Sequence, residues 1–447
     1  MSLYTTLVAS ALFPLHERLK RHSTVRVERA MEKTQWYSPD EIANLQLARL
    51  RDFLHRIGRD VPYYRELFRQ LCFDPARLAS LEDLQALPLT GKPDIRDNFD
   101  ALVSEQAGTL EKFSTGGSSG EPLIFYRGKE RVSHDVAAKW RATRWWDVDI
   151  GDTEVVIWGS PIELGAQDRV RLLRDKMLRT HLLSAFEMSN ANMLEFTQRL
   201  RQLRPRMLFG YPSSIALLAE YASANGYRVD DLGIKVVFVT SERLYEHQRE
   251  LIERVFGCPV ANGYGGRDAG FIAHECPEGG MHITAEDIVV EIVDDDGKVL
   301  PLGERGEIVI THLATADFPF VRYRTGDVGC LSDEVCRCGR GLPLLGDIDG
   351  RTTDFVHAAD GTVLHGLALI YILREMPEIR EFRIIQESLT QITLQLATST
   401  QDREVLESHV SRQFRRRLGD AVMVEFDYVD QVPREASGKF RYVVSRI

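Results

Sequence analysis

Residues 234–257 read IKVVFVTSERLYEHQRELIERVFG, a short apolar run followed by a segment with apolar residues at helical spacing. The same alternation occurs earlier, in TEVVIWGS (153–160) and in RPRMLFGYPSS (204–214), which leads into IALLAEYASANG (215–226). Short apolar strands that alternate with helices indicate a parallel sheet with helices on both faces. We therefore predict an α/β domain built from residues of about 100 to 265.

The segments on either side have a different character. Residues 1–75 predict helices, with a Ser start signal and helical spacing in SPDEIANLQLARLRDFLHRIG. After Gly270, IVVEIVDDDGKVL predicts a β-hairpin around an Asp-Gly turn, and RGEIVITHL predicts another strand. The last hundred residues predict a strand pair, an amphipathic helix and a final strand. We expect a large N-terminal domain (1–350) with a β-hairpin subdomain, and a small mobile α+β domain (351–447).

Length, charge and cysteine content narrow the class of protein. The chain has 447 residues, 27% of them charged, and its net charge of −10 argues against sequence-independent nucleic-acid binding. The run LVASALFPL (Leu7 to Leu15) is too short to span a bilayer. It predicts the buried face of a helix, with contact to a membrane surface as the alternative. Six cysteines do not make a disulfide scaffold in a chain of this length, and we expect a cytoplasmic protein.

The stretch FSTGGSSGEPLIF (113–125) places glycines and hydroxyl residues directly before an apolar run. It is not a Gly-Lys-Ser/Thr phosphate loop, because no Lys follows its last glycine, and its glycine spacing excludes a dinucleotide fingerprint. Backbone N–H groups and hydroxyls in such a loop can surround a polyphosphate. An ordinary surface turn is the alternative.

Three further motifs carry chemistry. In NGYGGRDAG (262–270), Tyr264 lies between glycines and can offer its ring to a flat ligand, while Asp268 can bind Mg²⁺. In VRYRTGDVG (321–329), Asp327 follows a tight turn and can accept hydrogen bonds from two vicinal hydroxyls. In ASGKFR (436–441), Lys439 stands in a Gly-flanked loop. Taken singly, a buried tyrosine, a turn aspartate and an exposed lysine explain these residues as well.

The order of these motifs resembles that of the adenylate-forming superfamily of acyl-coenzyme A ligases, adenylation domains and luciferases. GRDAGFIAHEC (266–276) and CRCGR (336–340) look like the phenylacetate–coenzyme A ligase-like, capsule-biosynthesis-type branch. The resemblance covers the chain from about residue 80 to its end. It implies activation of a carboxylic acid by ATP and magnesium as an acyl adenylate with release of pyrophosphate. Transfer to coenzyme A with release of AMP follows.

The resemblance also implies roles for matching positions. Tyr264 would stack on adenine, Asp327 would bind the ribose with help from Arg351, and Lys439 would bridge the reacting groups. Thr353 takes the hinge position, about which the small domain turns between half-reactions. The loop for the β- and γ-phosphates would comprise Ser114, Thr115, Gly116, Gly117, Ser118, Ser119 and Gly120. Ser241, Glu242 and Gly265 would line the nucleotide and acyl pocket.

The chain departs from the family pattern at several positions. Leu123 stands where many relatives have Lys, and Arg267, where Thr is common, can restore a positive charge near the phosphates. Asp268 replaces the usual Glu and would reach Mg²⁺ through a shorter arm. VTSERL (239–244) replaces a Gly-Gly-Glu turn, and Thr353 stands where an acidic residue or Lys is common.

Cysteines and histidines cluster in HECPEGGMH (274–282) and CRC (336–338). Cys276, His282, Cys336 and Cys338 would satisfy tetrahedral Zn²⁺, although the spacing is not that of a standard finger. The family resemblance supports a structural zinc in some members. Cys330 and His274 are alternative ligands, and reduced, packed cysteines are the alternative to a metal site.

The acid substrate is expected to lie near Trp158, Tyr211, Pro212, Ser213 and Ser241, whose aromatic walls suit an aryl or other flat acid. Two rival functions stay open. The acyl group could pass to a carrier-protein thiol or an amine, or the chain could be a non-catalytic, zinc-containing interaction protein on the same fold.

Overall fold

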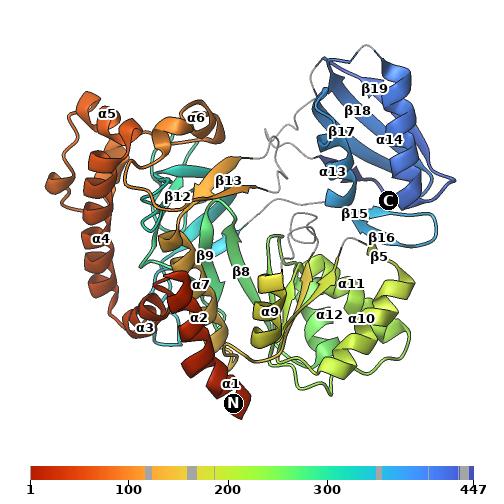
Figure 1. The fold of residues 1–447 in the computed structure, drawn as a ribbon, viewed down its shortest axis with the longest axis horizontal. Helices are drawn as coiled ribbons and strands as arrows, with labels where there is room; N and C mark the ends of the chain where they lie inside the picture. Colours follow the sequence, from red (N-terminus) through yellow and green to blue (C-terminus); the bar gives the residue numbers. More distant parts are fainter. Residues whose placement is uncertain are drawn as a thin grey trace.

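The computed structural model describes residues 2–115, 123–158, 169–185, 187–348, 355–400, 402–430, 432 and 442–447. A helical N-terminal part flanks a large sheet, and a smaller C-terminal unit lies on the other side of the molecule (Figure 1). In these described parts, no helix is both long and apolar enough to cross a membrane.

The first part of the chain is helical, as predicted. It contains α1 (Leu3–Leu7), a π-helical segment η1 (Val8–Leu12), α2 (Phe13–Lys20), α3 (Thr24–Thr34), α4 (Pro39–Asp60) and α5 (Pro62–Gln70). Ser38 begins α4 with a capping box, in which its hydroxyl accepts from the Glu41 N–H and the Glu41 carboxylate accepts from the Ser38 N–H. After α6 (Lys92–Asp97), the hairpin β1 (Glu111–Ser114)–β2 (Ile124–Arg127) leads into α7 (Lys129–Arg144).

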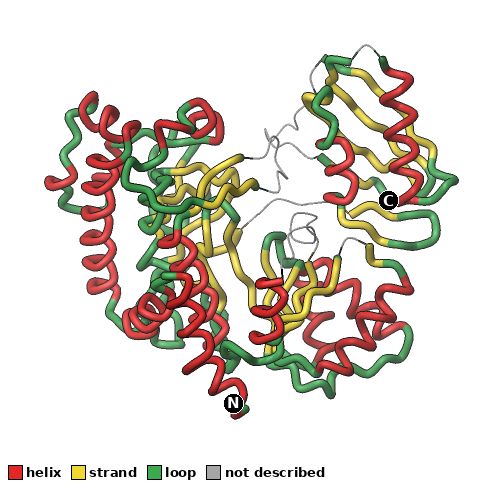
Figure 2. The backbone as a smooth tube through the Cα atoms, in the orientation of Figure 1, coloured by secondary structure: helices red, strands yellow, loops and turns green. Residues whose placement is uncertain are grey.

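The central sheet has eleven strands in the order β11-β12-β13-β14-β10-β9-β8-β7-β6-β3-β4. The parallel part comprises β3 (Glu154–Trp158), β4 (Thr180–Ser184), β6 (Met207–Gly210), β7 (Val236–Thr240) and β8 (Val260–Gly266). Its connecting helices are α9 (Arg169–Leu178), α10 (Asn190–Leu203), α11 (Pro212–Ala224) and α12 (Glu246–Phe256). Figure 2 shows these helices around the strands. The predicted alternation of strand and helix is confirmed.

The sheet changes direction after β8. The antiparallel part comprises β9 (Gly270–Glu275), β10 (Met281–Ile283), β11 (Ile288–Val293), β12 (Gly306–His312), β13 (Tyr323–Ser332) and β14 (Leu344–Ile348). The predicted hairpin at the Asp-Gly turn was only partly right. The turn forms, with the Asp294 N–H donating to the Lys298 carbonyl, but the returning segment makes one bridge, Val293↔Val299. Pro301 lacks a ladder donor, and the long partner of β11 is β12.

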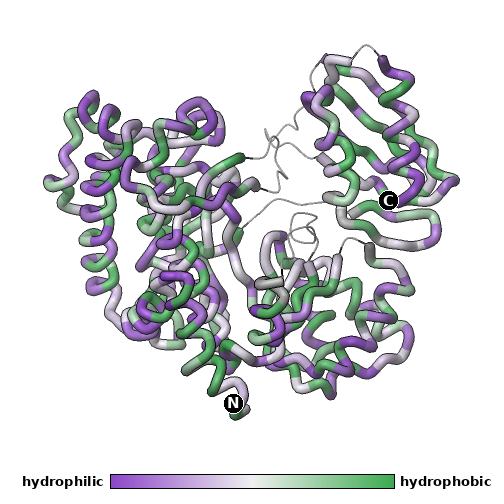
Figure 3. Tube along the Cα trace, viewed as in Figure 1, coloured by the Kyte–Doolittle hydropathy of each residue, from purple (hydrophilic) through white to green (hydrophobic). Residues whose placement is uncertain are grey.

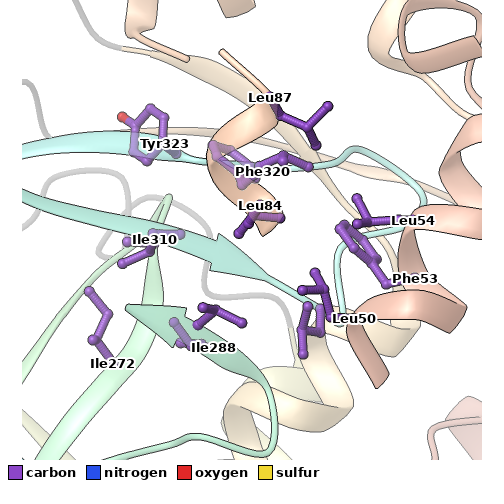
Figure 4. Packing of buried hydrophobic residues seen from close by; sticks show 14 of the residues in the cluster. Leu50, Phe53, Leu54, Leu84, Leu87, Ile272, Ile288, Ile310, Phe320 and Tyr323 are labelled. Carbon is purple, nitrogen blue, oxygen red and sulfur yellow. The ribbon is translucent and has the colours of Figure 1, made fainter. Parts of the chain in front are cut away.

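Two apolar cores hold these parts. In the first, Leu50, Phe53 and Leu54 of α4 lie toward Ile288 of β11 (Figure 4), and all four are nearly inaccessible to solvent. The second lies around the parallel strands and α10–α12. Strands that are buried on both faces read as continuous apolar runs, as β7 does. This explains why the parallel strands were the easiest elements to predict.

The C-terminal unit has the predicted α+β character. It contains β15 (Phe355–His357), β16 (Val363–His365), α13 (Leu367–Arg374), β17 (Ile379–Ser388), β18 (Gln391–Thr398), α14 (Arg403–Leu418), β19 (Met423–Tyr428) and β20 (Val443–Ser445). Its four-stranded sheet has the order β19-β18-β17-β20. β16 also pairs with β5 (Glu187–Met188), which ties the unit to the α/β part. The predicted boundary at 350/351 lies outside the described residues.

Candidate active site and metal centre

A cavity of about 660 Å³ lies where the parallel and antiparallel parts of the sheet meet. The carboxyl ends of β7 and β8 form its wall, as ligand sites do in open α/β sheets. Most of the predicted site residues that the structure describes lie here. They are Thr115, Trp158, Tyr211, Ser241, Glu242, Tyr264, Gly265, Arg267, Asp268 and Asp327.

Tyr264 and Asp327 come from different strands and meet in this cavity. The Tyr264 hydroxyl, on β8, donates to Oδ2 of Asp327, on β13, at 3.1 Å. The Asp327 N–H donates to the Thr325 hydroxyl, so the turn before the aspartate is itself held in place. An aromatic face and a carboxylate therefore lie beside one another, which suits a base joined to a diol-bearing sugar.

Asp268 lies in the turn between β8 and β9. Its Oδ2 accepts a hydrogen bond from the Tyr323 hydroxyl at 2.7 Å, and its Oδ1 accepts from the Ala269 N–H at 3.1 Å. Tyr323 is fully buried, so it holds the carboxylate in one orientation. An oriented carboxylate oxygen at a cavity wall is the donor type that Mg²⁺ prefers.

Two stacked aromatic side chains also line the cavity. Trp158 of β3 and Tyr211 stack with their ring centroids 4.2 Å apart and an interplanar angle of 23°. Two predicted pocket residues take a supporting place instead. Pro212 is buried at the first turn of α11, and the Ser213 hydroxyl hydrogen-bonds to the Glu242 carboxylate. Neither is among the described residues that line the cavity.

Ser241 has a backbone conformation that few side chains adopt. Its φ of +72° lies in the left-handed region, where glycine is favoured. Where relatives have a Gly-Gly-Glu turn, this chain therefore has a serine in a backbone conformation that glycine favours. This strain lies at the cavity wall, directly before Glu242.

Several predicted residues lie outside the described parts of the chain. They are Gly116, Gly117, Ser118, Ser119, Gly120, Arg351, Thr353 and Lys439. The two ends of the glycine-rich loop are described. Ser114 ends β1, and the buried Thr115 accepts from the Leu123 N–H through its hydroxyl at 2.9 Å.

The sequence reasoning missed other groups that line the cavity. The guanidinium of Arg249 and the Glu275 carboxylate form an ion pair at 2.9 Å, and Glu275 also accepts from the Asn262 N–H. Burial raises the pKa of Glu275. Lys92 also lines the cavity. Its one sequence signal was the Gly-Lys-Pro helix start, and nothing in a single sequence indicates the pairing of Arg249 with Glu275.

The structure brings together the four residues predicted to bind zinc. One ligand atom from each of Cys276, His282, Cys336 and Cys338 lies within 4.8 Å of the others. The His282 Nε2 is 3.1 Å from the Cys338 Sγ, and the Cys276 and Cys336 Sγ atoms are 3.5 Å apart. The alternatives Cys330 and His274 are not part of this group among the described residues.

The surroundings of this Cys₃His cluster fit a metal. The His282 Nδ1 lies 3.3 Å from the Leu342 carbonyl, which leaves Nε2 directed at the sulfurs, as in zinc-bound histidines. A side chain at Gly280 would collide with Cys336, so only glycine permits this approach. Burial raises the pKa of Cys276 to about 12. Burial also acts to raise the pKa of Cys338, but hydrogen bonds with Arg340, Cys336 and Cys276 together outweigh it, and the net pKa is lowered.

Comparisons with known proteins bear on this chain from several sides. The family "AMP-binding enzyme" matches residues 179–316, and "CapK C-terminal domain" matches residues 356–446. Protein CapK of Staphylococcus aureus is 23% identical over 97% of this chain and 94% of its own. A phenylacetate-coenzyme A ligase of Pseudomonas putida is 26% identical over 92% and 95%.

Solved structures share the fold. A 2-hydroxyisobutyryl-CoA ligase in complex with 2-HIB-AMP and CoA, in the thioesterification state, aligns with a TM-score of 0.65 and 22% identity over 91% of this chain and 90% of its own. The same ligase in the postadenylation state aligns with a TM-score of 0.60. The structural matches confirm the fold class predicted from the sequence, and the family models and curated relatives confirm the resemblance.

Proposed function

We propose, from the place of this chain in the phenylacetate–coenzyme A ligase-like branch of the adenylate-forming superfamily, that the protein is an AMP-forming acid–thiol ligase. It activates a carboxylic acid with ATP as an acyl adenylate and releases pyrophosphate. The acyl group then passes to coenzyme A, and AMP is released. Relatives named phenylacetate-coenzyme A ligase support this reaction.

The contact between Tyr264 and Asp327 carries the proposal. A ribose held by the Asp327 carboxylate would place its base against the Tyr264 ring, and Thr115 and Arg267, which line the same cavity, would then receive the phosphates. Adenine needs a flat face and ribose needs an acceptor for two hydroxyls. The cavity offers both, since the Tyr264 hydroxyl lies within hydrogen-bonding distance of the Asp327 carboxylate.

The first half-reaction needs positioning and charge more than proton transfer. A carboxylate is already a nucleophile at neutral pH, so its attack on the α-phosphorus requires no general base. Arg267 stabilises the charge that develops on the phosphates, and Lys439 bridges the carboxylate, the ribose oxygen and the α-phosphate. Asp268, oriented by Tyr323, would hold magnesium, which cancels phosphate charge when bound.

The second half-reaction needs a different arrangement. The thiol of coenzyme A must reach the acyl carbon, where Lys439 stands during adenylation. We expect residues 351–447 to turn about Thr353 so that the lysine leaves and the thiol enters. The bond from carbonyl carbon to sulfur forms, the bond from that carbon to the phosphate oxygen breaks, the thiol proton passes to solvent, and AMP leaves.

The acid is a small or aryl acid. Stacked Trp158 and Tyr211 form a flat aromatic part of the cavity lining. Zinc in the Cys₃His cluster is structural, because all four positions of a tetrahedral site are filled by protein. The six free cysteines suit a reducing compartment, and we place the protein in the cytoplasm.

Pyrophosphate release with a library of carboxylic acids tests the reaction. Release that depends on both ATP and one class of acid supports the proposal, and AMP release that requires coenzyme A identifies the acceptor. AMP release with an amine or a carrier protein, but not with coenzyme A, would show that the acyl acceptor is that amine or carrier protein. No acid-dependent pyrophosphate release with any acid would overturn the proposal.

Replacement of Lys439 by Ala separates the two half-reactions. Lys439→Ala is expected to lower adenylate formation at least about a hundredfold while transfer from a supplied acyl adenylate is retained. Lys298→Ala, in an exposed turn, is the matched control and should change neither. Equal loss of both half-reactions would contradict the role of Lys439.

A further inference from the structure

The N-terminal helix carries an apolar face that the rest of the described chain does not cover. Leu3, Leu7, Leu15 and Leu19 have exposed fractions of 92%, 50%, 56% and 76%. They recur at intervals of four residues, with the exposed Ala11 at the one remaining position. The helix lies at the edge of the molecule, on the side away from the C-terminal unit (Figure 1). This leucine face comprises Leu3, Leu7, Ala11, Leu15 and Leu19.

The π-helical segment aligns this face. Side chains four apart drift steadily around a regular α-helix, because four residues exceed one turn. Residues Val8–Leu12 form a π turn, which takes more residues per revolution and brings the next leucine back toward the same side. The leucine face therefore continues from α1 through η1 into α2.

The opposite side of the helix is anchored. Val8 and Phe13 are buried against Trp140 and Ile150, and a side chain at Gly151 would collide with Val8. The Thr5 hydroxyl donates to Asp152 at 2.8 Å. The helix is thus fixed by one face, and the exposure of its leucines does not come from a loose end.

Charge distinguishes this region from the rest of the chain. The whole protein has a net charge of −10, yet the exposed charged residues within 2–31 are all cations: Arg18, Lys20, Arg21, Arg26 and Arg29. The two carboxylates of that range are hidden. Glu17 is 4% exposed and contacts His16, His22 and Thr24, while Glu28 is 5% exposed and pairs with Arg144. Figure 3 shows hydrophobic and hydrophilic residues mixed along this helix.

We propose that the leucine face and its cations dock the protein on an anionic membrane surface. A helix that lies in the interface buries its leucines among acyl chains while lysine and arginine reach the phosphates of the headgroups. A second copy of the chain fits less well, because a two-fold contact would bring two sets of cations together. The acidic remainder of the protein would be repelled from such a surface, which orients the helix toward it.

Sedimentation with vesicles tests this proposal without reference to catalysis. The full chain should bind vesicles of phosphatidylglycerol mixed with phosphatidylcholine and remain unbound with phosphatidylcholine alone. Leu15→Ser/Leu19→Ser and Arg18→Gln/Lys20→Gln should each weaken partitioning about tenfold or more. The matched control is Leu302→Ser/Leu389→Ser, which removes exposed leucines elsewhere and should bind as the parent does.

Thermal unfolding of each variant, together with its sedimentation velocity, completes the test. Variants that melt with the parent and lose vesicle binding support the proposal, as does weaker binding at high salt. Absence of binding by the parent would overturn it, and so would unchanged binding by the leucine variant. The proposal also fails if the parent is a dimer that the leucine substitutions dissociate. It fails likewise if the parent binds an acidic protein but not vesicles, because the leucine face then serves protein contacts.

Discussion

The two parts of the central sheet differ in how many polar side chains they bury among the described residues. In the parallel part, residues 154–260, the buried polar side chains of the described chain are Glu154, Thr197 and Ser214. In the antiparallel part, residues 262–348, they include His274, His282, Thr284, Glu286, Asp287, Glu291, Thr311, His312, Thr315, Arg322 and Thr325. Both parts contain apolar cores, but the antiparallel part also contains buried charged side chains and the Cys₃His cluster.

Helix α7 shows how the antiparallel part is built. Arg141 of α7 pairs with Glu286 at 2.6 Å, and both side chains are buried. His134 of α7 pairs with Asp287 at 2.7 Å. Such pairs add little net stability, but loss of one partner is costly because a buried charge is left alone. Different substitutions should therefore lower the stability of the two parts. Substitutions in either part should affect ligand binding in the cavity, which lies at their junction.

The largest effect is expected from disruption of the Cys₃His cluster, which we propose binds zinc. Cys276→Ser should abolish zinc binding and lower the free energy of unfolding by about 3 kcal/mol or more, because binding energy at a structural zinc site is folding energy. Zinc content by mass spectrometry and denaturant unfolding measure this. Cys258→Ala, which removes a buried thiol from the parallel part, is the control and should leave zinc content unchanged. Full stability without metal would contradict a structural zinc.

A substitution in the parallel part should lower the free energy of unfolding by a similar amount without changing the zinc content. A Cβ at Gly210 would lie 2.3 Å from the Ile157 carbonyl oxygen of the neighbouring strand, and a backbone atom cannot move aside easily. Gly210→Ala should cost about 3 kcal/mol of unfolding free energy, as overpacking does, with zinc content retained. Gly108→Ala, where a Cβ meets nothing within 4 Å, is the control. Loss of zinc in Gly210→Ala would show that the two parts are coupled.

The contrast also explains which features a sequence can predict. The parallel strands and the Cys₃His ligands were predictable, because each depends on a local property: a continuous apolar run, or rare soft ligands gathered in two short segments. The Tyr323–Asp268 contact and the Arg249–Glu275 pair were not predictable, because they depend on which distant segments meet. The φ of Ser241 was not predictable, because a serine rarely adopts the left-handed region. The hairpin after Val293 failed for the same reason, since β12 competed for the edge of β11.

The junction itself can be tested through Tyr323. Tyr323→Phe removes the hydroxyl that orients Asp268, without changing the packing of the ring. Loss of one hydrogen bond to a carboxylate costs roughly 1.5 kcal/mol, so the magnesium concentration needed for half-maximal pyrophosphate release should rise about tenfold. Tyr221→Phe, on α11 away from Asp268, should leave it unchanged. An unaltered magnesium dependence in Tyr323→Phe would contradict the role of Asp268.

The smallest expected effect is a loss of stability of the antiparallel part as the pH falls. Burial, together with the charge of Arg131, lowers the pKa of His312 from 6.5 to about 4 against the opposing effect of Asp135. Between these values the unfolded chain binds a proton at this residue and the folded chain does not, so unfolding takes up a proton and stability falls as pH falls. The slope from this one group approaches about 1.4 kcal/mol per pH unit below pH 6.5.

His312→Gln should remove that share of the slope, and denaturant unfolding at pH 7 and pH 5.5 measures it. At pH 5.5 the difference between parent and variant should be about 1 kcal/mol smaller than at pH 7, because the variant has no imidazole to protonate on unfolding. His247→Gln, at an exposed position on α12 beside the parallel part, is the matched control. Equal slopes for His312→Gln and the parent would contradict the lowered pKa of His312, which is the acid-sensitive group of the antiparallel part.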